Sequence, residues 1–295
     1  MMKFGKYGVF TFTDMLDARG LGELCGRLEE LGYSTLWYPE AMGYETFAAG
    51  AYLLSQSQKL VVASGIANIY ARDPAASVMG HDTLNRLYDN RFVLGLGVSH
   101  APLVNDVRGH QYSRPVATMR AYLEAMNQAW EALGSMGMGV GTAPRQVVLA
   151  ALGPKMSRLA ADMTLGVFPY NITPDQVAQS RAAMGKQGAI ICEQKVCLCE
   201  DPVEARAAAR AALSFYIGLP NYYNNWFRLG FTEADLADGG SDRLLDAMVL
   251  WGDAASIKAR LDQYFEQGAD QVVIQPLRPD GQPGPDYAAL EALAG

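Results

Sequence analysis

The sequence predicts a (β/α)8 barrel, a closed ring of parallel strands surrounded by helices. Eight short apolar runs occur along the 295 residues, and amphipathic helical patterns separate them. Several helical patterns begin with a polar residue or glycine followed by proline, which is typical of a helix start. Eight strands favour a barrel over an open doubly wound sheet, which usually has about six.

The strands are expected where an apolar run ends in polar residues or glycine. We place them at residues 7–12, 35–39, 60–68, 92–98, 146–152, 165–170, 189–198 and 271–275. The clearest unit joins 60–68 to 92–98 through a helix that starts at Pro74. In such units the functional groups collect at the carboxyl ends of the strands, so the pattern predicts an enzyme.

One connection is much longer than the others. The stretch between Cys199 and Gln271 is too long for a single helix. We therefore expect a helical insertion at about residues 203–252 within a single domain that spans residues 1–295. Its part around residues 221–227 is rich in aromatic residues and asparagine, which is unusual for a linker. A lid and a subunit interface are both open as its role.

Composition limits the classes of partner. A formal net charge of −7 argues against nucleic acid, because phosphate binding needs clustered Lys and Arg. No apolar run approaches the roughly 20 residues that span a bilayer, and the N-terminus lacks a signal-peptide layout. We expect a cytoplasmic protein that acts on a small molecule. The four cysteines lack the spacing of a zinc site, so we interpret them as core thiols and expect no metal.

Two titratable side chains at predicted strand ends are the catalytic candidates. His100 lies two residues beyond the strand 92–98, and an imidazole titrates near neutral pH. Glu40 closes the strand 35–39, where a carboxylate can act as an acid or base, or can merely cap a turn. We expect His100 to transfer a proton and Glu40 to orient it or to charge the site. His81 lies within a helix and is expected to be structural.

Two glycine-containing junctions are candidate cofactor sites. Gly153, Pro154 and Lys155 form a strand-to-helix junction that can offer backbone N–H groups and a cation to a phosphate. An ordinary turn without a ligand fits this junction equally well. The stretch G-L-G-V-S-H at 95–100 begins like a dinucleotide fingerprint but lacks the third glycine, so it is weak evidence for a nicotinamide cofactor.

Five stretches together resemble one known family. They are L-G-Y-S-T-L-W-Y-P-E-A, A-S-G-I-A-N-I-Y-A-R-D-P, R-F-V-L-G-L-G-V-S-H-A-P-L-V, A-A-L-G-P-K-M and G-L-P-N-Y-Y-N-N-W-F-R-L-G-F. Over nearly its whole length the chain resembles the bacterial luciferase-like superfamily, and within it the coenzyme F420-dependent oxidoreductases. The resemblance implies the same barrel, coenzyme F420 as cofactor and a homodimer.

The resemblance also implies a set of cofactor contacts. In that superfamily the third strand ends in a bulge with a non-prolyl cis peptide, which here would join Gly65 to Ile66 and support the deazaflavin ring. The other implied contacts are Asn68, Val98 and Ser99 at the ring and Gly153, Pro154 and Lys155 at the phosphate. In the sugar-phosphate dehydrogenase branch, a His stands in place of Glu40 and a Glu in place of His100. We therefore do not carry over the substrate of that branch.

The remaining strand ends suggest what the substrate is. The pocket residues expected there are uncharged, which favours an uncharged or amphipathic substrate: Phe12, Tyr170, Asn171 and Gln275. The leading hypothesis is hydride transfer between the deazaflavin C5 and a small organic substrate. An FMN-dependent monooxygenase on the same barrel and a non-catalytic deazaflavin-binding protein are the alternatives.

Overall fold

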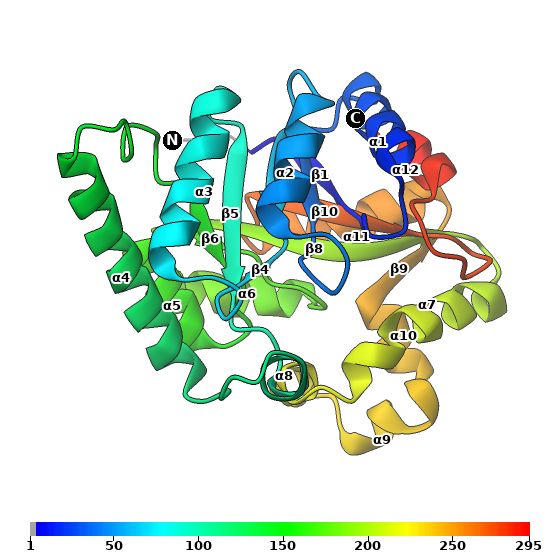
Figure 1. The fold of residues 1–295 in the computed structure, drawn as a ribbon. Helices are drawn as coiled ribbons and strands as arrows, with labels where there is room; N and C mark the ends of the chain where they lie inside the picture. The colour runs from blue at the N-terminus through cyan, green and yellow to red at the C-terminus, as the bar shows by residue number, and fades with distance from the viewer. Residues whose placement is uncertain (1–3) are drawn as a thin grey trace.

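A computed structural model, which describes residues 4–295, confirms the predicted barrel (Figure 1). The strands are β1 (Tyr7–Phe10), β2 (Thr35–Tyr38), β3 (Val61–Ser64), β4 (Ala67–Asn68), β5 (Phe92–Gly97), β6 (Val147–Leu149), β7 (Gly166–Val167), β8 (Ala189–Leu198), β9 (Val249–Gly252) and β10 (Gln271–Leu277). The ring runs β10–β1–β2–β3–β5–β6–β7–β8 through parallel pairs, and β8 closes it by pairing with β10.

Helices cover the outside of the ring and form the insertion. They are α1 (Ala18–Glu30), α2 (Thr46–Ser55), α3 (Pro74–Leu87), α4 (Pro115–Ser135), α5 (Pro154–Met163), α6 (Pro174–Met184), α7 (Pro202–Ile217), α8 (Pro220–Arg228), α9 (Glu233–Leu236), α10 (Asp242–Met248), α11 (Ala254–Glu266) and α12 (Tyr287–Leu293), with a π-helix at Leu103–Val107 and a 3-10 turn at Ala237–Gly239. Among the described residues, no helix combines the length and apolar character that crossing a bilayer requires.

The expectation that several helices begin with proline is confirmed at α3, α5, α6 and α7. Helices α3 and α7 are capped by Asp73 and Asp201, whose carboxylates accept first-turn backbone N–H groups. Helices α5 and α6 also begin with proline, but the residues before them, Gly153 and Thr173, provide no side-chain cap. The first turn of α5 therefore keeps an N–H group available to a ligand.

The interior of the barrel is filled by large apolar side chains. One buried layer takes a residue from each barrel position: Phe10, Trp37, Ala63, Val93, Val148, Phe168, Ile191 and Val273. Within it the Trp37 and Phe168 rings stack with centroids 4.3 Å apart. The barrel is therefore a packed core, and a ligand can enter only above this layer, at the carboxyl ends of the strands.

The third predicted strand is divided in two. β3 ends at Ser64, and β4 resumes at Ala67 and pairs with β5. The peptide bond between Gly65 and Ile66 is cis, as the family resemblance implied. We call residues 65–68 the bulge segment.

The insertion was predicted to be helical, and this is wrong at its end, where β9 forms. The strand β7 pairs with only the first two residues of β8, Ala189 and Ile190. The rest of that edge of the ten-residue β8 is therefore free to pair, and β9 occupies it from Lys195 to Leu198. The helices of the insertion share a small core of their own with the end of β8, and Trp226 of α8 is fully buried in it.

Candidate active site at the carboxyl ends of the strands

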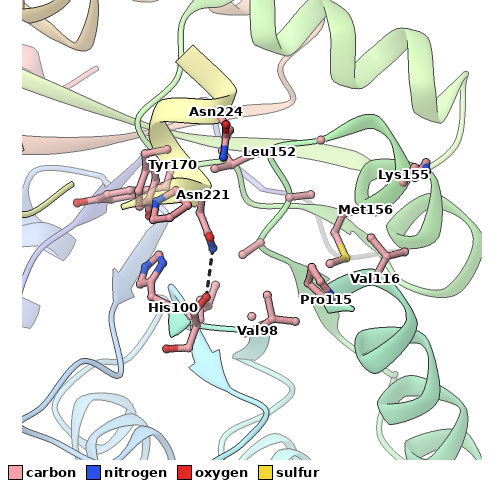
Figure 2. A pocket seen from close by; sticks show the side chains of 18 of the residues that line it. Val98, His100, Pro115, Val116, Leu152, Lys155, Met156, Tyr170, Asn221 and Asn224 are labelled. Carbon is pink, nitrogen blue, oxygen red and sulfur yellow. Dashed lines mark hydrogen bonds between the residues drawn. The ribbon is translucent and has the colours of Figure 1, made fainter. Parts of the chain in front are cut away.

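A cavity of about 560 Å³ opens at the carboxyl ends of β5 and β6. Its walls come from the bulge segment, the loops after β5 and β6, the start of α5, and α8 of the insertion. Figure 1 shows β5 pointing toward the side of the molecule where α8 lies. A hydrogen bond of 3.2 Å from Asn221 Nδ2 to the Ser99 carbonyl joins α8 to the end of β5 (Figure 2).

Eight of the residues predicted from the sequence line this cavity: Ile66, Val98, Ser99, His100, Gly153, Pro154, Lys155 and Tyr170. Figure 2 shows Val98, Val116 and Met156 on one side, with His100 and Tyr170 across from them. The cavity thus has an apolar wall and a wall that carries hydrogen-bonding groups, which is the usual composition of a small-molecule site.

The bulge segment reaches the cavity through Ile66. Gly97 lies beneath this side chain, and a Cβ atom at Gly97 would collide with Ile66. Glycine is therefore required at this strand end for Ile66 to lie over β5. Gly65 and Asn68 do not line the cavity; Asn68 is 4% exposed and accepts the Tyr70 N–H through its Oδ1 at 2.9 Å.

His100 lies at the polar side of the cavity under the insertion. Its ring packs near Tyr222 of α8 and Phe215 of α7, with centroid distances of 5.6 and 6.4 Å. Its Nδ1 atom is buried and has no hydrogen-bond partner within residues 4–295. Burial lowers the pKa of His100 below its ordinary value of 6.5, so the ring is neutral at pH 7. The residue lines the cavity, and an imidazole at a cavity wall can exchange a proton with a bound molecule.

Glu40 is not placed beside His100. Its Oε2 accepts the Asn68 N–H at 2.8 Å, its Oε1 accepts the Thr46 N–H at 3.3 Å, and Arg72 binds both oxygens. Glu40 lines a separate small pocket together with Arg72 and Glu45. The structure therefore does not support the expectation that Glu40 orients His100, because local backbone and Arg72 occupy the carboxylate.

A buried ion pair in the barrel was missed by the sequence analysis. Lys195 Nζ lies 3.1 Å from Glu193 Oε1, and both side chains are 1% exposed. The ammonium also donates to Asn171 Oδ1 at 2.5 Å and lies 3.8 Å from the centroid of the Tyr170 ring. The sequence carries a signal for this pair, the E-Q-K stretch inside an otherwise apolar strand. Charged residues in a buried strand are expected to pair with each other, because an unpaired buried charge is costly.

The other predicted pocket residues lie elsewhere. Phe12 and Gln275 line a second cavity of about 480 Å³ near the ends of β1 and β10. The Tyr170 hydroxyl donates to Gln275 Oε1 at 2.9 Å, so this bond lies between the two cavities. Asn171 lines neither cavity; it is 2% exposed, and its carbonyl accepts the Trp226 indole N–H at 3.0 Å. The prediction that Asn171 lines the pocket is therefore wrong.

His81 and three of the four cysteines are buried in the interior of the protein. His81 is fully buried and bonds to Asp82 at 2.9 Å and to the Gln146 N–H at 3.1 Å, which confirms a structural role. All four cysteines are free thiols, and three are buried: Cys25, Cys192 and Cys197. Within residues 4–295 no cluster of three or more His, Cys, Asp or Glu side chains is arranged to hold a metal ion.

Comparisons with known proteins agree with this architecture. A candidate coenzyme F420-dependent oxidoreductase from Mycobacterium tuberculosis is 24% identical over 85% of this chain and 89% of its own length. The solved structure of coenzyme F420-dependent tetrahydromethanopterin reductase from Methanopyrus kandleri superposes with a TM-score of 0.75 at 16% identity, covering 99% of this chain and 97% of that one.

A further solved structure shares the fold. An F420-dependent secondary alcohol dehydrogenase, in complex with an F420–acetone adduct, superposes with a TM-score of 0.73 at 15% identity over 99% of this chain and 97% of that one. At these identities the likeness of the solved structures establishes the fold. Residues 2–271 match the luciferase-like monooxygenase family, which is most of the chain. The chain belongs to the luciferase-like monooxygenase family.

Proposed function

We propose that this protein is an F420-dependent oxidoreductase that transfers a hydride between the deazaflavin C5 and a small organic substrate. The observation that carries the proposal is the first cavity, which joins an apolar wall, a histidine and an uncapped helix start. The relatives and solved structures named above include F420-dependent enzymes, which supports the choice of cofactor.

The residues of the cavity fit a flat ring with an anionic tail. Ile66, Val98 and Ala150 offer apolar surface for the ring. At the other end, a Cβ atom added to Gly153 would meet only Arg228 Nη2, at 3.9 Å, so this backbone is open to a ligand. Lys155 and Arg228 also line the cavity. An anion bound there would interact with the N-terminus of α5 and with two cationic side chains.

The cofactor would donate a hydride when the substrate is reduced, or accept one when the substrate is oxidised. The role of the chain is to hold the ring, exclude water and move the accompanying proton. His100 is the residue proposed to donate or accept that proton, because it lines the cavity and an imidazole can exchange a proton there. Phe12 and Gln275 would contact the substrate from the second cavity, with Tyr170 between the two.

The same proposal assigns the remaining implied contacts. Ser99 would approach an edge of the ring and Pro154 would border the phosphate, whereas Asn68, which does not line the cavity, would act through the backbone of the bulge segment. Gly65 would support the ring through the backbone of the bulge segment.

A cytoplasmic location and a homodimer are part of this proposal; light scattering after gel filtration tests the oligomeric state. If α8 were buried between subunits rather than covering the cavity, substitutions on its surface would change the molecular mass of the oligomer and leave cofactor binding intact.

A cofactor titration tests the proposal. Oxidised F420 and FMN are titrated separately into the purified protein, and binding is followed by fluorescence quenching. We expect F420 to bind in the low micromolar range or better and FMN to bind much more weakly. Equal binding, or a preference for FMN, would overturn the assignment. Oxygen uptake with reduced FMN would favour the monooxygenase, whereas tight F420 binding without turnover of any carbonyl, imine or activated alkene would favour a non-catalytic binding protein.

A further inference from the structure

Glu40 is bonded to the bulge segment from two sides. Its backbone N–H donates to the Ile66 carbonyl at 3.4 Å, and its carboxylate Oε2 accepts the Asn68 N–H at 2.8 Å. The two peptide groups lie on either side of Ala67. One residue at the end of β2 thereby binds the backbone immediately before and after Ala67, next to the side chain of Ile66 that faces the cavity.

The direction of the Glu40 carboxylate is itself fixed. Arg72 Nη1 lies 3.1 Å from Oε2, and Arg72 Nη2 binds Oε1, so the guanidinium holds the carboxylate through both oxygens. The Glu40 and Arg72 side chains are only 6% and 10% exposed. Arg72 also contacts Glu45 at 2.9 Å, and its carbonyl accepts the Tyr122 hydroxyl at 3.0 Å. The arginine is therefore held from several elements.

This arrangement gives the Asn68 N–H a charged acceptor in a nearly dry place. Asn68 is 4% exposed, so water is a poor replacement for the carboxylate. Loss of the carboxylate charge weakens both the bond to this N–H and the grip of Arg72. The expected consequence is a bulge segment that samples other backbone positions, which would move Ile66 relative to the apolar wall.

We propose that Glu40 is a positioning residue for cofactor binding, holding the bulge segment so that Ile66 presents a fixed apolar surface to the ring. Glu40 does not line the cavity, so it would not touch a ring bound there. The inference rests on the proposed function, since it assumes that the ring binds against Ile66. It replaces the expectation of a proton-transfer partner with a role exerted through the backbone of another segment.

Glu45 provides a matched control within the same cluster. Both Glu40 and Glu45 contact Arg72, so Glu40→Gln and Glu45→Gln each remove one negative charge from the same guanidinium. Glu45 Oε2 accepts the Phe47 and Ala48 N–H groups at the start of α2, and glutamine can keep those bonds. Glu45 has no hydrogen bond to the bulge segment among the contacts of the described residues.

The experiment measures F420 affinity by fluorescence quenching and backbone protection by hydrogen exchange of a peptide that covers residues 65–68. We expect Glu40→Gln to weaken F420 binding about tenfold and to speed exchange in that peptide. Glu45→Gln should leave both readouts within about twofold of the wild type. A melting temperature that falls equally in both variants would show that general stability does not explain the difference.

The outcomes separate the inference from the function on which it rests. If the wild type binds F420 and the two variants have equal affinities, Glu40 does not position the cofactor surface. If exchange at 65–68 rises in Glu40→Gln while affinity is unchanged, the bulge segment is not part of the cofactor site. Absence of F420 binding by the wild type overturns the proposed function itself, and this inference with it.

Discussion

Two buried acid–base pairs lie near the carboxyl ends of the barrel strands, and they bind different kinds of partner. The Glu193–Lys195 pair lies inside the barrel, where Lys195 contacts the Asn171 side chain and the Tyr170 ring, and Glu193 accepts one backbone N–H, that of Asn171, at 3.1 Å. The Glu40–Arg72 pair lies beside β2, and Glu40 binds backbone N–H groups, including one in the bulge segment. The first pair supports the cavity wall that contains Tyr170, whereas the second holds the main chain of the bulge segment.

The difference shows how the same chemistry can serve stability in one place and site geometry in another. Burial lowers the pKa of Lys195 and raises the pKa of Glu193, because both charges have lost water and mainly compensate each other. Removing Lys195 leaves the buried Glu193 charge without its cation and with a single backbone donor, the Asn171 N–H. The Glu40 carboxylate, in contrast, would still have two backbone donors if Arg72 were removed.

The largest expected effect is on turnover, and it comes from a change at His100. Unlike the acids and bases of the two pairs, this titratable side chain has no ionic partner. His100→Ala should lower turnover by about a hundredfold to ten-thousandfold, the usual contribution of a positioned acid or base. Cofactor affinity and unfolding free energy should change little, since Nδ1 bonds to no group of the described chain. Single-turnover rates at saturating F420 measure the effect; an unchanged rate would remove His100 from the mechanism.

The pH dependence of the same reaction provides a second check. Because burial holds the pKa of His100 below 6.5, the neutral ring predominates at pH 7. In the direction of substrate oxidation, where His100 accepts a proton, the rate should stay level above that pKa and fall as pH drops through it. In the reductive direction the rate should instead fall as pH rises through the same pKa. In His100→Gln, both of these pH dependences should be absent.

The next largest effect tests the interior pair. Lys195→Met keeps most of the side-chain length but leaves Glu193 without its cation, and the unfolding free energy should fall by about 3–5 kcal/mol. Urea unfolding followed by tryptophan fluorescence measures the change. The double variant Lys195→Met/Glu193→Gln should recover much of the loss, because no unpaired charge remains. A loss below about 1 kcal/mol would mean that the pair contributes little beyond its volume.

The sequence predicted the barrel well because its signals are local. Apolar runs and helix starts such as Asp73-Pro74 depend on neighbours in the chain, and seven of the eight predicted strands form at their expected positions with only their ends shifted. The third was expected as one run and is interrupted at Gly65. The cis peptide there was implied by family resemblance, not by the pattern of the residues.

The contacts that were missed depend on partners far apart in the sequence. Glu40 looked like a catalytic carboxylate because nothing local indicates that Arg72, 32 positions away, binds it. The strand β9 forms because β7 is too short to cover the edge of β8. Predicting β9 would therefore require the lengths of all three strands. The pairing of Glu193 with Lys195 was readable from their alternation, but the contact of Lys195 with Tyr170 was not.

A smaller effect is expected at the outer pair. Arg72→Met removes the cation from Glu40 but leaves its bonds to Asn68 and Thr46, so the unfolding free energy should fall by about 2 kcal/mol. F420 affinity should fall as well, whereas Lys195→Met should leave affinity nearly unchanged in the folded protein, because Tyr170, which Lys195 supports, lies across the cavity from the apolar wall proposed for the ring. Urea unfolding and fluorescence titration of both variants measure this contrast. Equal losses of affinity in the two variants would break the comparison between the two pairs.

The smallest effect is expected from the hydroxyl of Tyr170, which shares the wall that Lys195 supports. The hydroxyl donates to Gln275 at 2.9 Å and lies 3.1 Å from the Tyr216 hydroxyl. Tyr170→Phe removes these bonds but keeps the ring above the Lys195 ammonium, so the unfolding free energy should fall by only about 1 kcal/mol. Tyr216→Phe, which keeps the bond from Tyr170 to Gln275, is the matched control and should cost less.

These two tyrosine variants separate the contributions of charge and hydroxyl within one wall. If Tyr170→Phe costs about 1 kcal/mol and Lys195→Met several times more, the ion pair and its contact with the ring hold the wall, and the hydroxyl adds a small increment. If Tyr170→Phe costs as much as Lys195→Met, the bond to Gln275 is the main support instead. In that case the boundary between the two cavities depends on a single neutral hydrogen bond, and substitutions at Gln275 should reproduce the loss.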